Sequence, residues 1–296
     1  MKKGLVLLHG DFSSAWEEPL KAAKIEWLGL HVNPFQATVD EFLAFVDNNR
    51  ELLSRLEKSM SVDYRLHAVS HFLPRALFDG EKELFRMNEK GERTADYNGC
   101  PSSEKTLAMV ESGAEKLAKR LKQKSERYHF WTDDDLGGDV RCHCAKCKHL
   151  SATEQNLIFY KAMLRGIKKY DGRAKLSFLV YGEETLDGEL PEGMFIEYAP
   201  FRRRHDLPFT QGKTNAQYAK RCQSLLDGGK PDEFEVLEYF LSYDYVGFCG
   251  DNKRVVKDVE YYRSLGVERL FTFVVFPEKN YVEKYGFDGI MQYASL

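Results

Sequence analysis

The chain has 296 residues, of which 43% are hydrophobic and 30% are charged. This length and composition allow a large buried core and argue against disorder. Its 43 Lys and Arg residues nearly balance its 46 Asp and Glu residues, and the net charge of −3 gives no general attraction to nucleic acid or to an anionic membrane. We therefore expect neither nucleic-acid nor membrane partners. The sequence does not define an oligomeric state.

The sequence also gives an expectation for cellular location. No apolar run approaches the roughly 20 residues that a membrane-spanning helix needs. The first ten residues hold a short apolar run behind two lysines, without a small-residue cleavage site after it. We interpret this run as a first strand and expect a cytoplasmic protein. Six cysteines, with three of them close together, do not fit a disulfide framework for a chain of this length.

Eight apolar runs of strand length alternate with segments of helical periodicity. The expected strands are Leu5–His9, Ile25–Val32, Val62–Val69, Arg127–Thr132, Ala174–Tyr181, Met194–Pro200, Phe234–Tyr243 and Leu270–Phe276. The expected helices are Phe12–Lys24, Thr38–Ser59, a helix from Ser102 or Ser103 to Leu121, Ser151–Tyr170, Asn215–Leu226, Asp251–Leu265 and Tyr281–Tyr293. Such alternation implies a parallel sheet, and eight units in about 300 residues favour a closed barrel. We predict a single α/β domain over residues 1–296, a (β/α)8 TIM barrel.

Two local features refine this prediction. Ser13 or Ser14 can cap the first helix, and Ser151 with Glu154 forms a capping box at the start of a later helix. The segment Phe72–Ser102, which follows the third strand, has no clear periodicity. A segment of this length in a compact domain is usually functional. We therefore predict a long insertion after strand three.

Histidines, carboxylates and aromatic residues gather where the expected strands end. They are His9, Asp11, His31, His67, His71, Trp131, Asp133, Asp134, Asp135, Tyr181, Glu183, Glu197, Tyr198, Glu238, Tyr239, Asp244 and Phe276. In barrels of this type the chemistry takes place at the carboxyl ends of the strands. This concentration therefore predicts a binding or active site at that end.

Paired carboxylates at this end favour glycoside chemistry. In glycosidases one carboxylic acid protonates the leaving oxygen, and a second carboxylate acts as base or nucleophile. The fourth strand supplies Asp133 or Asp134, and later strands supply Glu197 and Glu238. We predict Asp134 as the general acid and Glu238 as the second carboxylate. The alternatives are a helix-cap or turn role for Asp134, and a barrel-interior Glu238 paired with an arginine.

The other residues of the predicted site would bind a carbohydrate, because sugar C–H faces pack on aromatic rings and sugar hydroxyls need polar partners. They are His31, His67, Arg75, Trp131, Asp133, Tyr181, Glu197 and Tyr198. Each histidine could instead be structural. A metal-dependent hydrolase that uses the strand-end histidines and aspartates is a further alternative, weakened because no His-x-His follows the first strand.

A cysteine motif, Cys142-x-Cys144-x-x-Cys147, follows the aspartates. Three thiolates on a tight turn can surround one tetrahedral ion, which then needs a fourth ligand. Cys100 in the insertion is the best candidate, with His143 or His149 as alternatives. We predict a closed, structural zinc site that braces the loop beside the acids. The competing interpretations are free thiols and a disulfide.

Together these residues resemble the barrel domain of a bacterial family of carbohydrate-related proteins, the domain-of-unknown-function 4838 family. The matching segments are His67, His71–Arg75, Phe85–Arg86, Gly91 with Arg93, Asn98–Cys100, Trp131–Asp134, the cysteine motif, Glu197–Pro200 and Glu238–Tyr239. The resemblance implies a barrel related to glycoside hydrolases such as α-glucuronidases and hexosaminidases. Ser242 stands where the family pattern leads us to expect an acid, and either Asp244 compensates or the acid is missing. A non-catalytic carbohydrate-binding barrel is therefore the alternative function.

Overall fold

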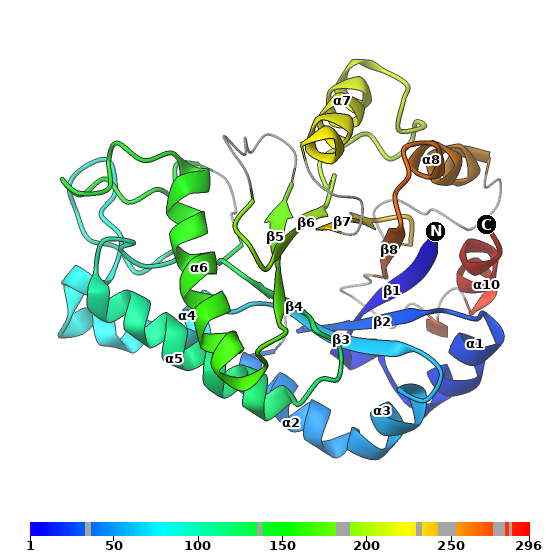
Figure 1. Ribbon diagram of the computed structural model, residues 1–296, viewed down its shortest axis with the longest axis horizontal. Coiled ribbons are helices and arrows are strands. Elements are labelled where there is room, and N and C mark those ends of the chain that lie inside the picture. The colour runs from blue at the N-terminus through cyan, green and yellow to red at the C-terminus, as the bar shows by residue number, and fades with distance from the viewer. Residues whose placement is uncertain are drawn as a thin grey trace. The chain divides into compact units, whose positions relative to one another are not determined.

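The computed structural model describes residues 1–32, 37–134, 138–181, 190–228, 233–241, 253–274, 282–283 and 286–296. Eight strands close into one barrel in chain order (Figure 1). They are β1 (Lys2–Leu8), β2 (Trp27–His31), β3 (Ser61–His67), β4 (Arg127–Trp131), β5 (Lys175–Val180), β6 (Met194–Tyr198), β7 (Phe234–Glu238) and β8 (Arg269–Val274). Within the described residues, helices separate consecutive strands along the chain except between β5 and β6. The predicted (β/α)8 TIM barrel is confirmed.

The first strand closes the barrel through two parallel ladders. Gly4 to Leu8 pair with β2, and Lys2 to Leu7 pair with β8. Gly4 permits this closure, because a Cβ at that position would lie 2.3 Å from the ring of Phe271. The residues from Leu5 to Leu8 are buried, as is typical of parallel strands that are covered on both faces.

The helices follow the predicted order with local differences. They are α1 (Glu17–Ala22), α2 (Val39–Asn48), α3 (Arg50–Leu56), α4 (Val69–Phe72), α5 (Glu104–Leu121), α6 (Ala152–Tyr170), α7 (Lys213–Asp227), α8 (Lys253–Ser264) and α10 (Asp288–Ser295), with short 3-10 turns η1 (His9–Asp11), η2 (Ser14–Trp16), η3 (Arg75–Asp79) and η4 (Lys82–Leu84).

Two helix boundaries correct the predictions. The single helix expected over 38–59 is two helices, because Asn49 leaves the helical region with φ −108° and ψ 12°, and its Nδ2 donates to the Phe45 carbonyl at 2.9 Å. The first expected helix begins as the turn η2, which Ser13 caps by accepting from the Ala15 N–H at 3.3 Å. The capping box at Ser151 is confirmed.

The chain packs as two compact units. The first comprises residues 1–64, 179–183 and 195–296, and the second comprises 65–178 and 184–194. The single domain over 1–296 stays a prediction. In the second unit α5 and α6 lie side by side (Figure 1). Gly166 of α6 allows this approach, because a Cβ there would lie 2.0 Å from the Glu111 backbone oxygen.

The predicted insertion, Phe72–Ser102, lies between β3 and α5; it begins at the last residue of α4 and contains η3 and η4. Its bridge between Met87 and Arg93 lies against the loop that follows β4, since the His143 N–H donates to the Met87 carbonyl at 2.7 Å. The insertion and that loop therefore form one substructure within the second unit.

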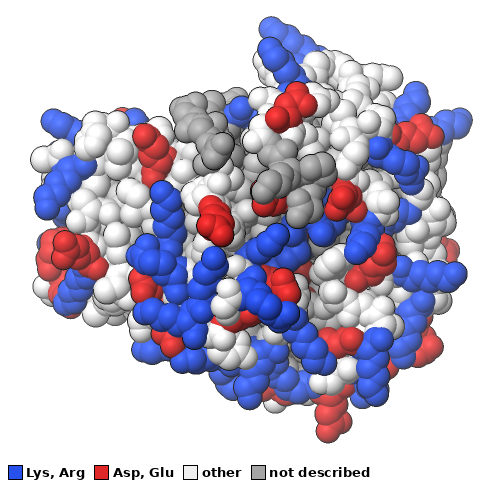
Figure 2. Space-filling model, viewed as in Figure 1, with Lys and Arg blue, Asp and Glu red and all other residues white. Residues whose placement is uncertain are grey.

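Two surface properties complete the description of the fold. On the face shown in Figure 2, Lys and Arg side chains are interspersed with Asp and Glu side chains, as expected from the near balance of charges. No helix within the described residues is both long enough and apolar enough to cross a membrane.

Candidate functional site

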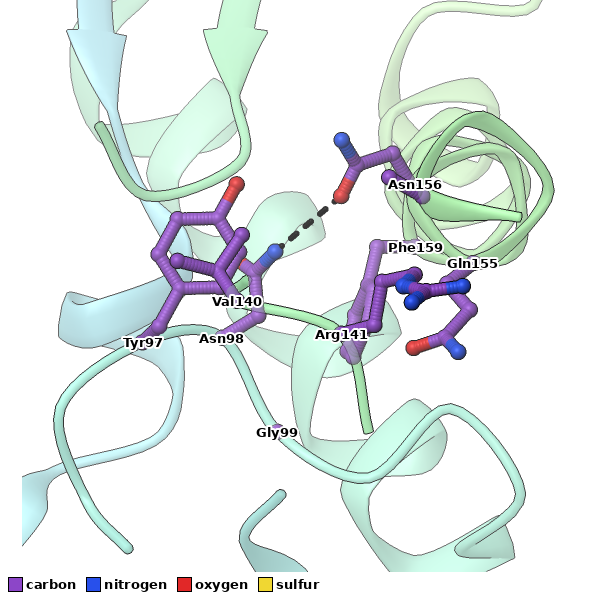
Figure 3. Close-up of a pocket in the computed structure, with 9 residues that line it drawn as sticks. Tyr97, Asn98, Gly99, Val140, Arg141, Gln155, Asn156 and Phe159 are labelled. Carbon is purple, nitrogen blue, oxygen red and sulfur yellow. Dashed lines mark hydrogen bonds between the residues drawn. The ribbon is translucent and has the colours of Figure 1, made fainter. Parts of the chain in front are cut away.

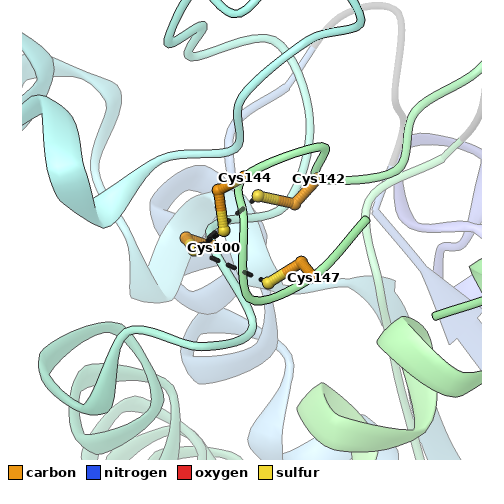
Figure 4. A group of neighbouring side chains, drawn as sticks. All are labelled: Cys100, Cys142, Cys144 and Cys147. Atoms are coloured by element: carbon orange, nitrogen blue, oxygen red, sulfur yellow. Dashed lines mark hydrogen bonds between the residues drawn. The ribbon is translucent and has the colours of Figure 1, made fainter. Parts of the chain in front are cut away.

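The four predicted cysteine ligands converge in the second unit (Figure 4). The Cys100 Sγ lies 3.7 Å from that of Cys142, 3.8 Å from that of Cys144 and 4.0 Å from that of Cys147. Four metal–sulfur bonds of about 2.3 Å in a regular tetrahedron give sulfur–sulfur edges of about 3.8 Å. This four-cysteine cluster can therefore hold one four-coordinate metal ion.

The geometry argues against a disulfide among these cysteines. All four are buried free thiols, and their Cys100 separations of 3.7 to 4.0 Å far exceed the roughly 2.05 Å of a disulfide bond. The side chains close enough together to hold one ion here are the four cysteines. The alternative ligand His143 contacts Asp139 instead, with its Nε2 3.1 Å from the Asp139 Oδ2. Cys100 is thus the fourth member of the cluster, and its role as a metal ligand stays a prediction.

Hydrogen-bond donors surround the sulfurs. The Met87 N–H donates to Cys142 at 3.4 Å, and the Ser102 hydroxyl lies 3.2 Å from Cys100. Hydrogen bonding from Cys142, aided by Ser102 and Arg93 and opposed by burial, lowers the pKa of Cys100 to about 4. Such donors are the usual outer partners of metal-bound thiolates.

Gln155 holds the cysteine loop to α6. Its Oε1 accepts from the Cys142 N–H at 2.7 Å, and its Nε2 donates to the carbonyls of Cys142 and Cys147, both at 3.1 Å. The capping box at Ser151 fixes the helix start and so places Gln155 in the first turn. Sequence reasoning missed Gln155, because its position in a helical turn resembles that of any surface glutamine.

Asp133 anchors the loop that follows β4. Its Oδ1 accepts from the Ser70 N–H at 2.8 Å, and its Oδ2 forms an ion pair with Arg75. Its own N–H donates to the Asn98 Oδ1 at 2.9 Å. The structure thus brings together two predicted sugar-binding residues, Asp133 and Arg75, and gives both a role in fixing the loop.

Asp134 is the exposed carboxylate of this loop. Its side chain is 50% exposed, and its Oδ1 lies 3.9 Å from the His67 Nε2. The His67 Nδ1 lies 2.5 Å from the Thr132 carbonyl oxygen. Because that oxygen only accepts, Nδ1 carries a proton and Nε2 faces the carboxylate. Asp134 and His67, both predicted site residues, therefore lie together at the carboxyl end of the barrel.

Trp131 forms the base of this site. The indole is buried, donates from Nε1 to the Ser177 hydroxyl at 2.7 Å, and packs against the His67 ring at a centroid distance of 5.2 Å. Its burial favours a supporting role over direct stacking on a sugar.

A small open cavity adjoins the Asp133 loop (Figure 3). Its volume is about 240 Å³ including its open mouth, and it is lined by Tyr97, Asn98, Gly99, Val140, Arg141, Ala152, Gln155, Asn156 and Phe159. Asn98 connects the cavity to its surroundings, because it bonds Asp133 and also donates to the Asn156 Oδ1 at 3.2 Å. Asn98 also precedes Cys100 by two residues. Asn98 therefore connects the loop that carries Asp133 and Asp134 to the segment that carries Cys100.

In the first unit, Glu238 is fully buried at the end of β7. The Arg203 Nε lies 3.1 Å from its Oε1, and the Tyr262 hydroxyl donates to the same oxygen at 2.6 Å. Arg203 also pairs with Asp258 of α8 at 2.8 Å. These partners agree with the alternative prediction of a barrel-interior Glu238 paired with an arginine, and they favour a structural role for Glu238. The catalytic role of Glu238 stays a prediction.

Three more predicted site residues lie deep in the first unit. His31 is buried, and its ring meets that of Phe273 edge-on at 5.2 Å. Glu197 of β6 is fully buried and lies in register with Glu235 of β7, with carboxylate oxygens within 4.8 Å of each other. Tyr198 is fully buried and donates to the Tyr218 carbonyl at 2.9 Å.

The remaining strand-end residues divide into two groups. Tyr181 is half-buried just beyond β5. Asp135, Glu183, Ser242, Asp244 and Phe276 lie outside the described residues.

Asp11, one of the strand-end residues, is a candidate to which the sequence prediction assigned no specific catalytic role. It follows β1 in the turn η1 and is buried. Burial, reinforced by the charge of Glu283, raises the pKa of its carboxyl to about 6. A carboxyl group shifted in this way near a strand end is suited to proton transfer near neutral pH. Its position after the first strand was the available signal.

Comparison with known proteins supports the fold. No family model matches the chain, and no curated protein matches it in sequence. The chain is similar in structure to the β-galactosidase from Bacillus circulans sp. alkalophilus, with TM-score 0.63, 12% identity and coverage of 100% of this chain and 55% of that one. It is also similar to the β-N-acetylhexosaminidase from Bacteroides fragilis, with TM-score 0.61, 14% identity and coverage of 99% and 65%.

A third match is the cellulose synthase subunit Z from Clostridioides difficile, with TM-score 0.56, 11% identity and coverage of 99% of both chains. The chain thus spans 55% and 65% of the length of the two enzymes above. At these identities the likeness concerns the fold alone. The chain has a TIM-barrel fold, and the solved structures above are similar to it in that fold.

Proposed function

We propose that the protein is a glycoside hydrolase that acts on an oligosaccharide or glycoside, and that it is related to the domain-of-unknown-function 4838 family. The observation that carries the proposal is the exposed Asp134 beside His67 at the carboxyl end of β4. The glycosidase names of the first two structural neighbours agree with it. Carbohydrate is the corresponding ligand.

In this proposal Asp134 is the general acid that protonates the leaving glycosidic oxygen. Asp133 and Arg75 hold the loop that carries it, so that the acid is positioned before substrate binds. The second carboxylate comes from a later strand. We keep Glu238 as that carboxylate and Glu197 as a substrate-binding residue; in this proposal Arg203 and Tyr262 hold the Glu238 side chain in place.

Hydrolysis of a panel of aryl glycosides tests these assignments. We expect Asp134→Asn to lower kcat/KM by about 100-fold or more on glycosides with poor leaving groups. The same variant should retain most activity on dinitrophenyl glycosides, because a good leaving group needs no proton. Glu238→Gln should lose activity on both kinds of substrate. Wild-type hydrolysis that survives Asp134→Asn on poor leaving groups would show that the acid assignment is wrong.

A non-catalytic carbohydrate-binding barrel is the second candidate function. It is favoured by the burial of Glu238 in an ion pair, and by the described residues that follow it, Tyr239 to Leu241, which are buried and include no acid. Binding of an oligosaccharide by calorimetry without any turnover would support this candidate over hydrolysis.

We also propose that the four-cysteine cluster binds a structural zinc ion. Four thiolates favour zinc and leave it no open position, so the ion would join the insertion to the loop after β4 without activating water. Metal analysis of the purified protein should find about one zinc per chain. Cys144→Ser should lose the metal, whereas Cys222→Ser, which removes a buried thiol of α7 outside the cluster, should keep it. Zinc retained after substitution of all four cluster cysteines would contradict the site.

A further inference from the structure

His67 and Asp134 form a histidine–carboxylate dyad at the ends of two adjacent strands of the second unit. His67 is the last residue of β3 and lies in register with Trp131, the last residue of β4. Asp134 follows β4 by three residues, and its Oδ1 lies 3.9 Å from the His67 Nε2. Contacts between acids and bases in a free enzyme are often longer than a hydrogen bond and shorten when substrate binds. A separation of this size is therefore compatible with proton transfer between the two side chains.

Hydrogen bonds to the backbone hold the two strand ends together. The Ala68 N–H donates to the Trp131 carbonyl at 2.9 Å, and so joins the segment directly after β3 to β4. The Ser70 N–H donates to the Asp133 Oδ1 at 2.8 Å, and so joins α4 to the loop after β4. These bonds fix the backbone positions of both members of the dyad.

The imidazole ring of His67 is also held in one orientation. Its Nδ1 donates to the Thr132 carbonyl at 2.5 Å, and the ring packs against the Trp131 indole at a centroid distance of 5.2 Å. The indole is held in turn by its bond to the Ser177 hydroxyl at 2.7 Å. Because the Nδ1 proton is committed to a backbone carbonyl, Nε2 is the ring nitrogen that can gain or lose a proton, and Nε2 is the nitrogen that faces Asp134.

The two side chains of the dyad differ in their exposure. The Asp134 side chain is 50% exposed, whereas that of His67 is 16% exposed. A substrate therefore meets the carboxyl group first, with the imidazole behind it. Among the charged and titratable groups on the surrounding elements, Asp133 and Arg75 pair with each other, and His71 of α4 packs against the ring of its neighbour in the chain.

We propose that His67 stores the proton that Asp134 delivers to the leaving glycosidic oxygen. In water an aspartic acid loses its proton at about pH 3.9, whereas an imidazolium keeps its proton to about pH 6.5. An isolated exposed aspartate therefore holds almost no proton to donate near neutral pH. The inference rests on the proposed glycosidase function, in which Asp134 is the general acid, and identifies the source of its proton.

The transfer conserves protons and charge. The Nε2–H bond of the His67 imidazolium breaks as an O–H bond forms on Asp134, and the Asp134 proton passes to the leaving oxygen as the glycosidic bond breaks. His67 is then neutral, Asp134 is again a carboxylate, and water returns a proton to Nε2. With this store, acid catalysis should persist to about pH 6.5.

The pH dependence of kcat/KM, measured on the full chain, tests this role of His67. His67→Asn keeps a donor for the Thr132 carbonyl and removes the titrating Nε2. On glycosides with poor leaving groups we expect it to lower kcat/KM by about 100-fold at about pH 6.5, but by only about tenfold at about pH 5, where more of the aspartate is protonated without help. Dinitrophenyl glycosides should be hydrolysed at the wild-type rate, which also shows that the variant is folded. His71→Asn, at the other histidine of this segment, is the matched control and should keep the wild-type pH dependence.

The outcomes separate the inference from the function on which it rests. A loss of equal size at both pH values, shared by dinitrophenyl glycosides, would show that His67 only contacts substrate, and would overturn its proton role. A wild-type pH dependence in His67→Asn would do the same, and either result leaves the glycosidase function standing. Failure of wild-type protein to hydrolyse any glycoside would overturn both. His67→Gln, with the same expected results, is the second variant if His67→Asn does not fold.

Discussion

Asn98 and Asp133 link the four-cysteine cluster to the acid loop. The Asn98 Oδ1 accepts the Asp133 N–H at 2.9 Å, and the Asn98 carbonyl accepts from Arg75 at 3.0 Å. Arg75 in turn pairs with the Asp133 carboxylate. Because Asn98 lies two residues before Cys100, we expect a displacement of the cluster to reach Asp133, the residue beside Asp134.

This link predicts that Asn98→Ala lowers activity more than stability. The variant leaves the Asp133 N–H without its acceptor, which costs about 1–2 kcal/mol in unfolding free energy. A small displacement of the adjacent acid should lower kcat/KM by about tenfold or more. Asn156→Ala is the control, because it removes the other partner of Asn98 and leaves the bond to Asp133 in place. Equal kcat/KM in the two variants would argue against the link.

A glycine holds the fourth ligand of the cluster in place. A Cβ on Gly99 would lie 2.6 Å from Thr106, 2.8 Å from Leu73 and 2.9 Å from the Leu84 carbonyl oxygen. That same oxygen accepts the Cys100 N–H at 2.9 Å. Gly99→Ala should therefore displace Cys100, lower the metal content per chain and lower Tm. Gly80→Ala, at an open position of the same insertion, should leave both unchanged.

The two predicted catalytic acids should differ in their effect on stability. Glu238→Gln breaks a buried ion pair and should cost about 3 kcal/mol in unfolding free energy. Asp134 is half exposed and 3.9 Å from its histidine neighbour, so Asp134→Asn should leave the unfolding free energy nearly unchanged. Denaturant titration measures both. A large loss of stability in Asp134→Asn would mean that this acid is structural.

The Arg203 network should make stability depend on pH. Burial raises the pKa of Asp258 to about 7, although Arg203 opposes the shift, whereas an unfolded aspartate has a pKa of about 3.9. Between these values the folded state binds more protons than the unfolded state, so this contribution to stability is complete at low pH and is lost as pH rises toward 7. Asp258→Asn removes the titrating group.

Thermal unfolding at several pH values tests this prediction. As pH rises from about 4 to 7, the Tm of wild type should fall relative to the Tm of Asp258→Asn. A constant difference across this range would show that Asp258 does not titrate there. Asp206→Asn is the control, because it changes an exposed aspartate in the loop that carries Arg203.

The sequence by itself determined the order and type of the main elements. Apolar runs of strand length alternate with amphipathic segments. Parallel strands joined by helices bury both faces of their sheet when the sheet closes into a barrel or lies between layers of helices. The helix starts at Ser103 and Ser151 were readable because a capping hydroxyl acts on its own local backbone. The cysteine motif was readable because three ligands of one ion can lie on one turn.

Tertiary structure decided which of these residues share a site. Alternation along β7 turns Glu238 away from its neighbour Leu237. Arg203 and Tyr262, which contact Glu238, and Asp258, which pairs with Arg203, come from distant segments that the sequence could not assign to this site. The break at Asn49 and the position of Gln155 beneath the cysteines likewise depend on side-chain contacts. Local pattern fixes which elements form, whereas a one-residue change of register decides which face of a strand meets substrate and which meets a helix.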